Sequence, residues 1–136
     1  MGGVEVKIAA IGVIDRYLNK GVMYPGGNAV NVAAHASMLG AQAAYIGEIG
    51  NDLGGRIITD ALSSLNVDLS QSSMPEKATT KTCDVNVYDG ERVEVGYDTG
   101  ACWAHKTHIN DSDVKFLQGF DAVFTSVNAK LQDDVH

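Results

Sequence analysis

The sequence contains little cysteine, which limits both disulfide and metal chemistry. Cys83 and Cys102 are the two cysteines among 136 residues. A small domain held by disulfides carries more cysteines than this, so we expect two reduced thiols. Cys102 opens a Cys-x₂-His-x₂-His run with His105 and His108. Because this spacing fits no standard zinc motif, a solvated loop is favoured over a metal site, and no metal is predicted.

Basic residues and long apolar runs are also scarce. The chain has 10 lysines and arginines against 17 aspartates and glutamates, and a net charge of −7. An acidic surface repels phosphate backbones and anionic lipids, so neither nucleic acid nor a membrane surface is an expected partner. No apolar run approaches the roughly 20 residues that cross a bilayer. The first residues lack the layout of a signal peptide, and we expect a cytoplasmic protein.

The remaining composition is that of a globular α/β domain. Apolar residues make up 45% of the chain and charged residues 20%, which allows a packed core in one domain. Val4–Ile14 is a β-rich apolar run, typical of a strand buried on both faces. Asn28 is the predicted N-cap of an alanine-rich helix that Gly40 ends. Residues 43–49 then predict a second strand, parallel to the first.

The later segments also have regular patterns. Asp52 begins a predicted helix whose apolar residues fall on one face. Apolar and polar residues then alternate on both sides of Asp89-Gly90, a strong signal for a hairpin turn. This half-exposed hairpin predicts a small separate sheet laid against the α/β body. Asn110 is a predicted cap of a short helix, and residues 121–127 predict another core strand.

A candidate binding site lies between the first strand and the first helix. Residues 15–25 are predicted to form a loop, and Asp15 could accept hydrogen bonds from two neighbouring hydroxyls. Gly26 and Gly27 would let backbone N–H groups approach a ligand at the helix N-terminus. Asn31, in the first turn, can both donate and accept. This pattern indicates a polar small molecule, and on spacing alone a tight turn with a structural asparagine is an equal alternative.

The same segment resembles the N-terminal signature of the PfkB-type, ribokinase-like sugar kinases. Residues 50–54 are similar to the glycine–aspartate turn that follows this signature, and residues 89–92 resemble the hairpin of the family's lid. Residues 23–33 resemble most closely the fructoselysine 6-kinases and related fructosamine kinases. The resemblance extends from Lys7 to Val127. The residues at the spacings of the signature are Gly26, Gly27, Asn31, Ala33, Gly40 and Gly50.

The resemblance implies a ribokinase-like α/β fold, a partial doubly wound parallel sheet with a small β-sheet lid. Residues 1–136 would form the N-terminal part of the kinase domain, with the lid hairpin at about 78–101. The implied activity is ATP- and magnesium-dependent phosphorylation of a sugar or sugar-amine hydroxyl, with a fructoselysine-like substrate favoured. The lid would also support a homodimer. The implied substrate-binding residues are Asp15, Gly26, Gly27, Asn28 and Asn31, and the implied lid residues are Asp89, Gly90 and Arg92.

Two departures from the family pattern limit what this chain is expected to do. The family's catalytic aspartate lies in a Gly-Ala-Gly-Asp motif, and this sequence contains no such motif. The C-terminal nucleotide-binding half is expected to be absent, so no catalytic residue is assigned and no ATP or magnesium is expected on this chain alone. The segment from Gly12 to Asp15 is also about two residues shorter than in the family, which puts the reach of Asp15 in doubt.

Three functions therefore stay open. The chain could supply the sugar-binding part of a sugar kinase, as a fragment, a truncated gene product or half of a split enzyme. It could be a non-catalytic module that binds sugar or dimerises through its lid. It could also be the decayed remnant of a kinase.

Overall fold

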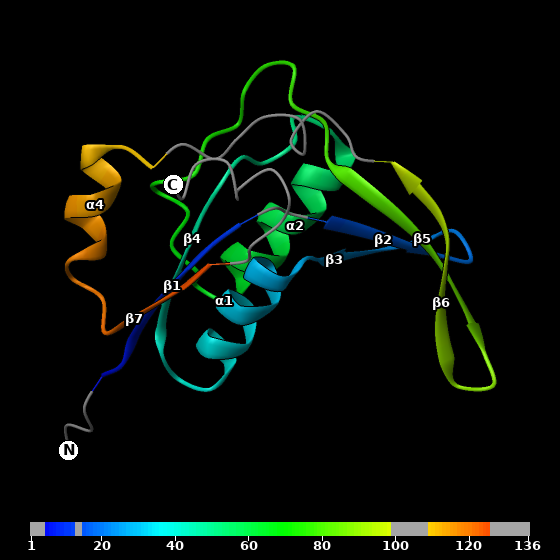
Figure 1. Cartoon of the computed structure of the whole chain (residues 1–136), viewed down its shortest axis with the longest axis horizontal. Coiled ribbons are helices and arrows are strands. Elements are labelled where there is room, and N and C mark those ends of the chain that lie inside the picture. The colour runs from blue at the N-terminus through cyan, green and yellow to red at the C-terminus, as the bar shows by residue number, and fades with distance from the viewer. Residues whose placement is uncertain (1–4, 13–14, 99–108, 126–136) are drawn as a thin grey trace.

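Two β-sheets form the framework of the chain. The computed structural model describes residues 5–12, 15–98 and 109–125. A parallel three-stranded sheet has the order β4-β1-β7, and a four-stranded sheet has the order β3-β2-β5-β6. Figure 1 shows them as separate layers, with helices between them. The parallel sheet is made of β1 (Lys7–Ile11), β4 (Gln42–Ile46) and β7 (Ala122–Thr125).

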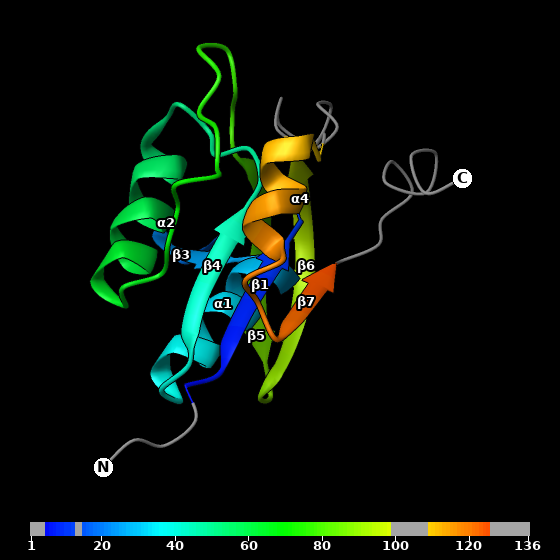
Figure 2. The ribbon, with the colours of Figure 1, turned by 90° about the vertical axis from the view of Figure 1, so that its left-hand side faces the viewer.

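Small side chains bring the first helix close to the parallel sheet. Helix α1 (Asn28–Met38) buries Ala29 and Ala33 completely. On the sheet, Ala9 and Ala10 of β1 are also fully buried. Helix α1 approaches β1, β4 and β7. Figure 2 shows α1 behind this sheet and the short helix α4 (Asp111–Leu117) in front of it.

Helix α2 (Leu53–Ser64) completes the core beside α1. Its Ile58 and Leu62 are buried in one cluster with residues of α1 and β4. Asp52 is its N-cap, as predicted from the sequence, and Asn110 caps α4 through a complete capping box with Asp113. No helix in the described part of the chain is long and apolar enough to cross a membrane.

The four-stranded sheet consists of two hairpins joined by a parallel pair. Strand β2 pairs antiparallel with β3 and parallel with β5, and β5 pairs antiparallel with β6. Both hairpins turn through two residues of positive φ, Lys20-Gly21 and Asp89-Gly90, the geometry that matches strand twist. The strands are β2 (Asp15–Asn19), β3 (Val22–Gly26), β5 (Lys81–Tyr88) and β6 (Glu91–Asp98).

Three sequence expectations are wrong at this point of the chain. Residues 15–25 are a hairpin instead of a loop, and β1 ends at Ile11 instead of Ile14. The N-cap of α1 is Gly27, so Asn28 is the first residue of the helix. The physical reason is that β3 continues to Gly26, and the chain enters the helix directly from that strand.

Tyr45 fixes the carboxyl end of β1. Its side chain is fully buried and its hydroxyl donates to the Gly12 carbonyl oxygen at 2.7 Å. A Cβ at Gly47 would lie 2.2 Å from the Tyr45 hydroxyl and 2.6 Å from the Gly12 oxygen. The end of β1 and the residues after β4 are therefore packed around a single buried hydroxyl.

Replacing Tyr45 by Phe tests this contact. The substitution leaves a buried carbonyl oxygen without the hydroxyl that donates to it, which costs about 1–2 kcal/mol of folding free energy. Urea unfolding of the chain should show this loss, whereas Tyr24→Phe, at a side chain that is 49% exposed, should leave the midpoint unchanged. Equal stability of the two variants would contradict the role of Tyr45.

Candidate functional site

Strand pairing aligns three residues of neighbouring strands, Gly26, Asp15 and Lys81, which we call the row. Asp15 and Gly26 are two of the predicted binding residues. Asp15 is the Cα partner of Gly26 on one side and of Lys81 on the other. Gly26 is followed directly by Gly27, the N-cap of α1. The row thus lies where the four-stranded sheet meets the N-terminus of α1, close to the carboxyl end of β1. Open α/β sheets bind their ligands at such an edge.

Gly27 controls how the chain enters the helix. Its φ of 99° and ψ of 144° lie in a region that is essentially restricted to glycine. The carbonyl oxygen of Gly27 accepts the first helical hydrogen bond, from the Asn31 N–H at 2.9 Å, and no side chain caps the helix. The N–H groups of residues 28–30 have no acceptor within a helix that starts here. They form a positive, donor-rich end suited to an oxygen-rich ligand.

Asn28 and Asn31 supply side-chain amides at the same helix end. Both residues are exposed, and Asn31 lies one turn above Gly27. His35 is one further turn along, and it is exposed as well. Residues four apart share one face of a helix, so His35 continues the face of Asn31 away from the row.

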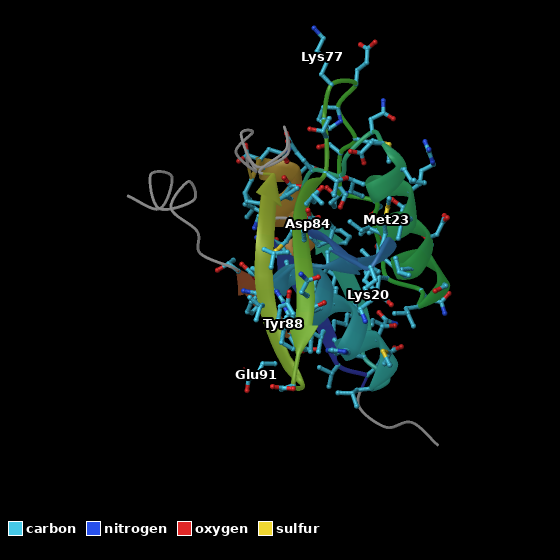
Figure 3. All side chains as sticks on the ribbon, turned by 90° about the vertical axis from the view of Figure 1, so that its right-hand side faces the viewer. Lys20, Met23, Lys77, Asp84, Tyr88 and Glu91 are labelled. Carbon is cyan, nitrogen blue, oxygen red and sulfur yellow. The ribbon has the colours of Figure 1, made fainter. Side chains whose placement is uncertain are left out.

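The predicted lid residues lie far from the row. Asp89, Gly90 and Arg92 are exposed at the turn of the β5–β6 hairpin. Arg92 pairs with Glu94 at 3.0 Å, with both side chains more than half exposed. An extended strand from Lys81 to this turn spans about 25 Å. Figure 3 shows Tyr88 and Glu91 toward this end of the hairpin, with Asp84 farther from the turn.

Lys81 was missed by the sequence reasoning. It belongs to the row because β2 and β5 pair in parallel, across a separation of more than sixty residues. A local pattern cannot reveal such a pairing, although the charged residue at the start of an alternating strand was a usable signal.

The candidate zinc ligands Cys102, His105 and His108 lie outside the described residues. Cys83, the other cysteine, is buried in β5. Within residues 5–12, 15–98 and 109–125, no group of three histidines, cysteines or acidic residues is arranged to hold a metal ion.

Comparisons with known proteins identify the fold and the family of this chain. Ribokinase of Arabidopsis thaliana, solved with ribose and ATP, matches with a TM-score of 0.74 at 20% identity, over 90% of this chain and 45% of that chain. This likeness confirms the predicted ribokinase-like fold. Residues 5–134 match the pfkB family of carbohydrate kinases, and the chain belongs to this family.

Two relatives with assigned functions support the predicted resemblance to fructosamine kinases. Fructosamine kinase FrlD of Bacillus subtilis is 32% identical over an alignment of 136 positions, which covers 96% of this chain and 47% of the relative. Fructoselysine 6-kinase of Escherichia coli is 28% identical over 128 residues, 93% of this chain and 48% of the relative. The chain therefore spans about half the length of the curated relatives that it matches.

Replacing Gly27 by Ala tests the helix entry. A Cβ at a positive φ costs about 1–2 kcal/mol per residue, and at Gly27 it also disturbs the start of α1. Gly40→Ala is the matched control, because Gly40 has a φ of 94° at the other end of the same helix and open space around its Cβ position. We expect Gly27→Ala to lower the free energy of unfolding more than Gly40→Ala. The reverse order, measured by urea unfolding, would contradict this account.

Proposed function

We propose that this chain supplies the sugar-binding part of an ATP-dependent kinase that phosphorylates a hydroxyl of a sugar or sugar amine, with a fructosamine such as fructoselysine favoured. The row of Gly26, Asp15 and Lys81 at the N-terminus of α1 is the observation that carries this proposal. Membership of the pfkB family supports the reaction class. The two fructosamine-type relatives support the substrate class.

The chemistry of the row suits a polyol. In this proposal the Asp15 carboxylate accepts hydrogen bonds from two neighbouring hydroxyls, since an ionised carboxylate has only acceptors. The N–H groups at the start of α1 donate to sugar oxygens, and the Asn31 amide can do both. A sugar presents donors and acceptors on adjacent carbons, so one face of it can be matched by this mixed set.

Phosphoryl transfer needs more than this chain offers. It depends on positioned phosphates, on magnesium and on a group that orients the attacking hydroxyl. The Gly-Ala-Gly-Asp motif that supplies the base in this family is missing from the sequence. In the proposal, ATP and magnesium bind to a further kinase half, and this chain by itself binds sugar without turnover.

Calorimetric titration of the chain with fructoselysine, fructose, ribose and adenosine tests sugar binding. We expect fructoselysine to bind, and Asn31→Ala to weaken it about tenfold through the loss of an amide that bonds a hydroxyl. His35→Ala is the matched control, one turn along the same exposed face, and should leave the affinity unchanged. Absence of binding to all four compounds, in a sample that unfolds cooperatively, would contradict the proposal.

A coupled ATP-consumption assay separates the enzyme from a sugar-binding module. We expect no turnover by the chain alone and turnover after addition of the C-terminal half of a fructosamine kinase. Turnover by the chain alone would show that the proposed division of labour is wrong. Sugar binding that no kinase half converts into turnover would favour the non-catalytic module.

We further propose that the four-stranded sheet is the lid, and that a second copy of the chain packs on it. Apolar side chains on this sheet are exposed: Val22 at 52%, Val95 at 55% and Tyr88 at 57%. Strand β6 is also a sheet edge, and unpaired edges favour association with another chain. The open edge of β6, together with the exposed Tyr88 and Val95 of its hairpin, is what favours a second copy of the same sheet.

Sedimentation velocity tests the dimer. Tyr88→Lys should shift the chain toward monomer, because it places a charge on the proposed interface. Met38→Lys, at a 65% exposed position at the end of α1, should not shift it. A wild-type chain that sediments as a monomer at all concentrations would contradict the proposed dimer.

A further inference from the structure

One carboxylate joins the body of the molecule to the four-stranded sheet. Asp52 caps α2, with its Oδ1 accepting from the Gly55 N–H at 2.8 Å. The same Oδ1 accepts from the Thr80 hydroxyl at 2.6 Å, and Oδ2 accepts from the Thr80 N–H at 2.8 Å. Three hydrogen bonds thus converge on one side chain, and two of them come from a residue 28 positions away.

Two glycines close to Asp52, Gly50 and Gly55, have no room for a side chain. A Cβ at Gly50 would lie 2.2 Å from the Thr80 hydroxyl oxygen, and a Cβ at Gly55 would lie 1.7 Å from the Gly50 carbonyl oxygen. Thr80 is only 4% exposed. A further bond, from the Asn51 N–H to the Ala78 carbonyl oxygen at 2.8 Å, holds the same two segments together. Gly50 and Gly55 therefore allow the start of α2 and the segment before β5 to come into close contact. The hydrogen bonds from Thr80 to Asp52 then fix how these two segments are oriented.

Thr80 directly precedes the row of binding residues. Strand β5 begins at Lys81, which is the Cα partner of Asp15 in β2. Asp15 is in turn the partner of Gly26. Asp52 thus fixes β5 at the residue before the point where β5 enters the row. Gly27 fixes the opposite side of the row at the start of α1.

We propose that Asp52 is a positioning residue for the sugar site and acts through Thr80. By holding Thr80, the residue before β5, against the N-terminus of α2, it keeps Lys81 and Asp15 in place relative to the N-terminus of α1. The proposal rests on the sugar-binding function proposed above. Helix capping uses one of the three hydrogen bonds described above, the one from Gly55. The two bonds from Thr80 give the aspartate of the Gly50–Gly54 turn a second task, which is to hold the start of β5.

Two substitutions of Thr80 separate positioning from capping. Thr80→Val keeps the shape of the side chain and the cap of α2, but removes the hydroxyl that donates to Asp52. Thr80→Ser keeps that hydroxyl and should restore wild-type behaviour. Thr59→Val is the matched control, since the Thr59 hydroxyl donates to the Gly55 carbonyl oxygen at 2.8 Å within α2 itself. It removes a part-buried hydroxyl from the same region without touching the row.

Amide hydrogen exchange and sugar titration are the two readouts, both on the full chain. We expect Thr80→Val to raise the exchange rates of the β2 and β5 amides about tenfold, as the loss of one hydrogen bond allows. It should weaken fructoselysine binding by a similar factor, with α1 exchange unchanged. Thr59→Val and Thr80→Ser should change neither. Should Thr80→Val fail to fold, Asp52→Asn, which preserves a good N-cap, should show the same increases.

The outcomes distinguish the anchor from the proposed function. Fast exchange in β2 and β5 with no sugar binding by the wild-type chain would uphold the anchor and overturn its role in a sugar site. Wild-type exchange and affinity in both Thr80→Val and Asp52→Asn would overturn the anchor. Equal losses in Thr80→Val and Thr59→Val would also overturn it, because they would reflect a general loss of stability.

Discussion

The backbone conformation at Gly27 is the constraint on which the rest of this structure depends. The chain leaves the parallel sheet after β1, forms a hairpin in the second sheet, and must return to begin α1 behind β1. It makes this return within one residue, at a φ of 99°, which a side chain would oppose. Because the turn is so abrupt, the last residue of β3 and the first turn of α1 become neighbours. Strand pairing then places Asp15 beside them.

The second sheet is held at two junctions of different chemistry. At Gly27 the chain passes from β3 into α1, and the link is covalent and short. At Thr80 the chain enters β5, and the link is a set of hydrogen bonds to Asp52. A covalent junction limits the distance between two elements, whereas a carboxylate with several donors also fixes their orientation. The row of binding residues lies between the two junctions, so its geometry depends on both.

The sequence allowed the local features to be predicted and left the pairing between distant strands unknown. The helix cap at Asp52 and the turn at Asp89-Gly90 have strong local signals, and both are confirmed. The β2–β3 hairpin was missed because its turn is Lys20-Gly21, and lysine seldom takes a positive φ. Asp15, Gly26 and Gly27 were predicted to share one site, and they do lie side by side, because β2 pairs with β3 and Gly27 follows β3 directly. Lys81 required a non-local parallel register that no short pattern encodes.

The position of the N-terminus of α1 depends on buried alanines that have no functional group for binding a ligand. Ala29 and Ala33 of α1 are fully buried in one cluster with Ala10 of β1, which is also fully buried. Small residues on both surfaces reduce the distance between helix and sheet, and close packing leaves little freedom to change it. A larger side chain at Ala10, Ala29 or Ala33, which share one buried cluster, would push α1 outward and carry its N–H groups away from the end of β1. The donors of the site are therefore placed by alanine packing as firmly as by the glycines, although only the glycines are recognisable as part of a binding motif.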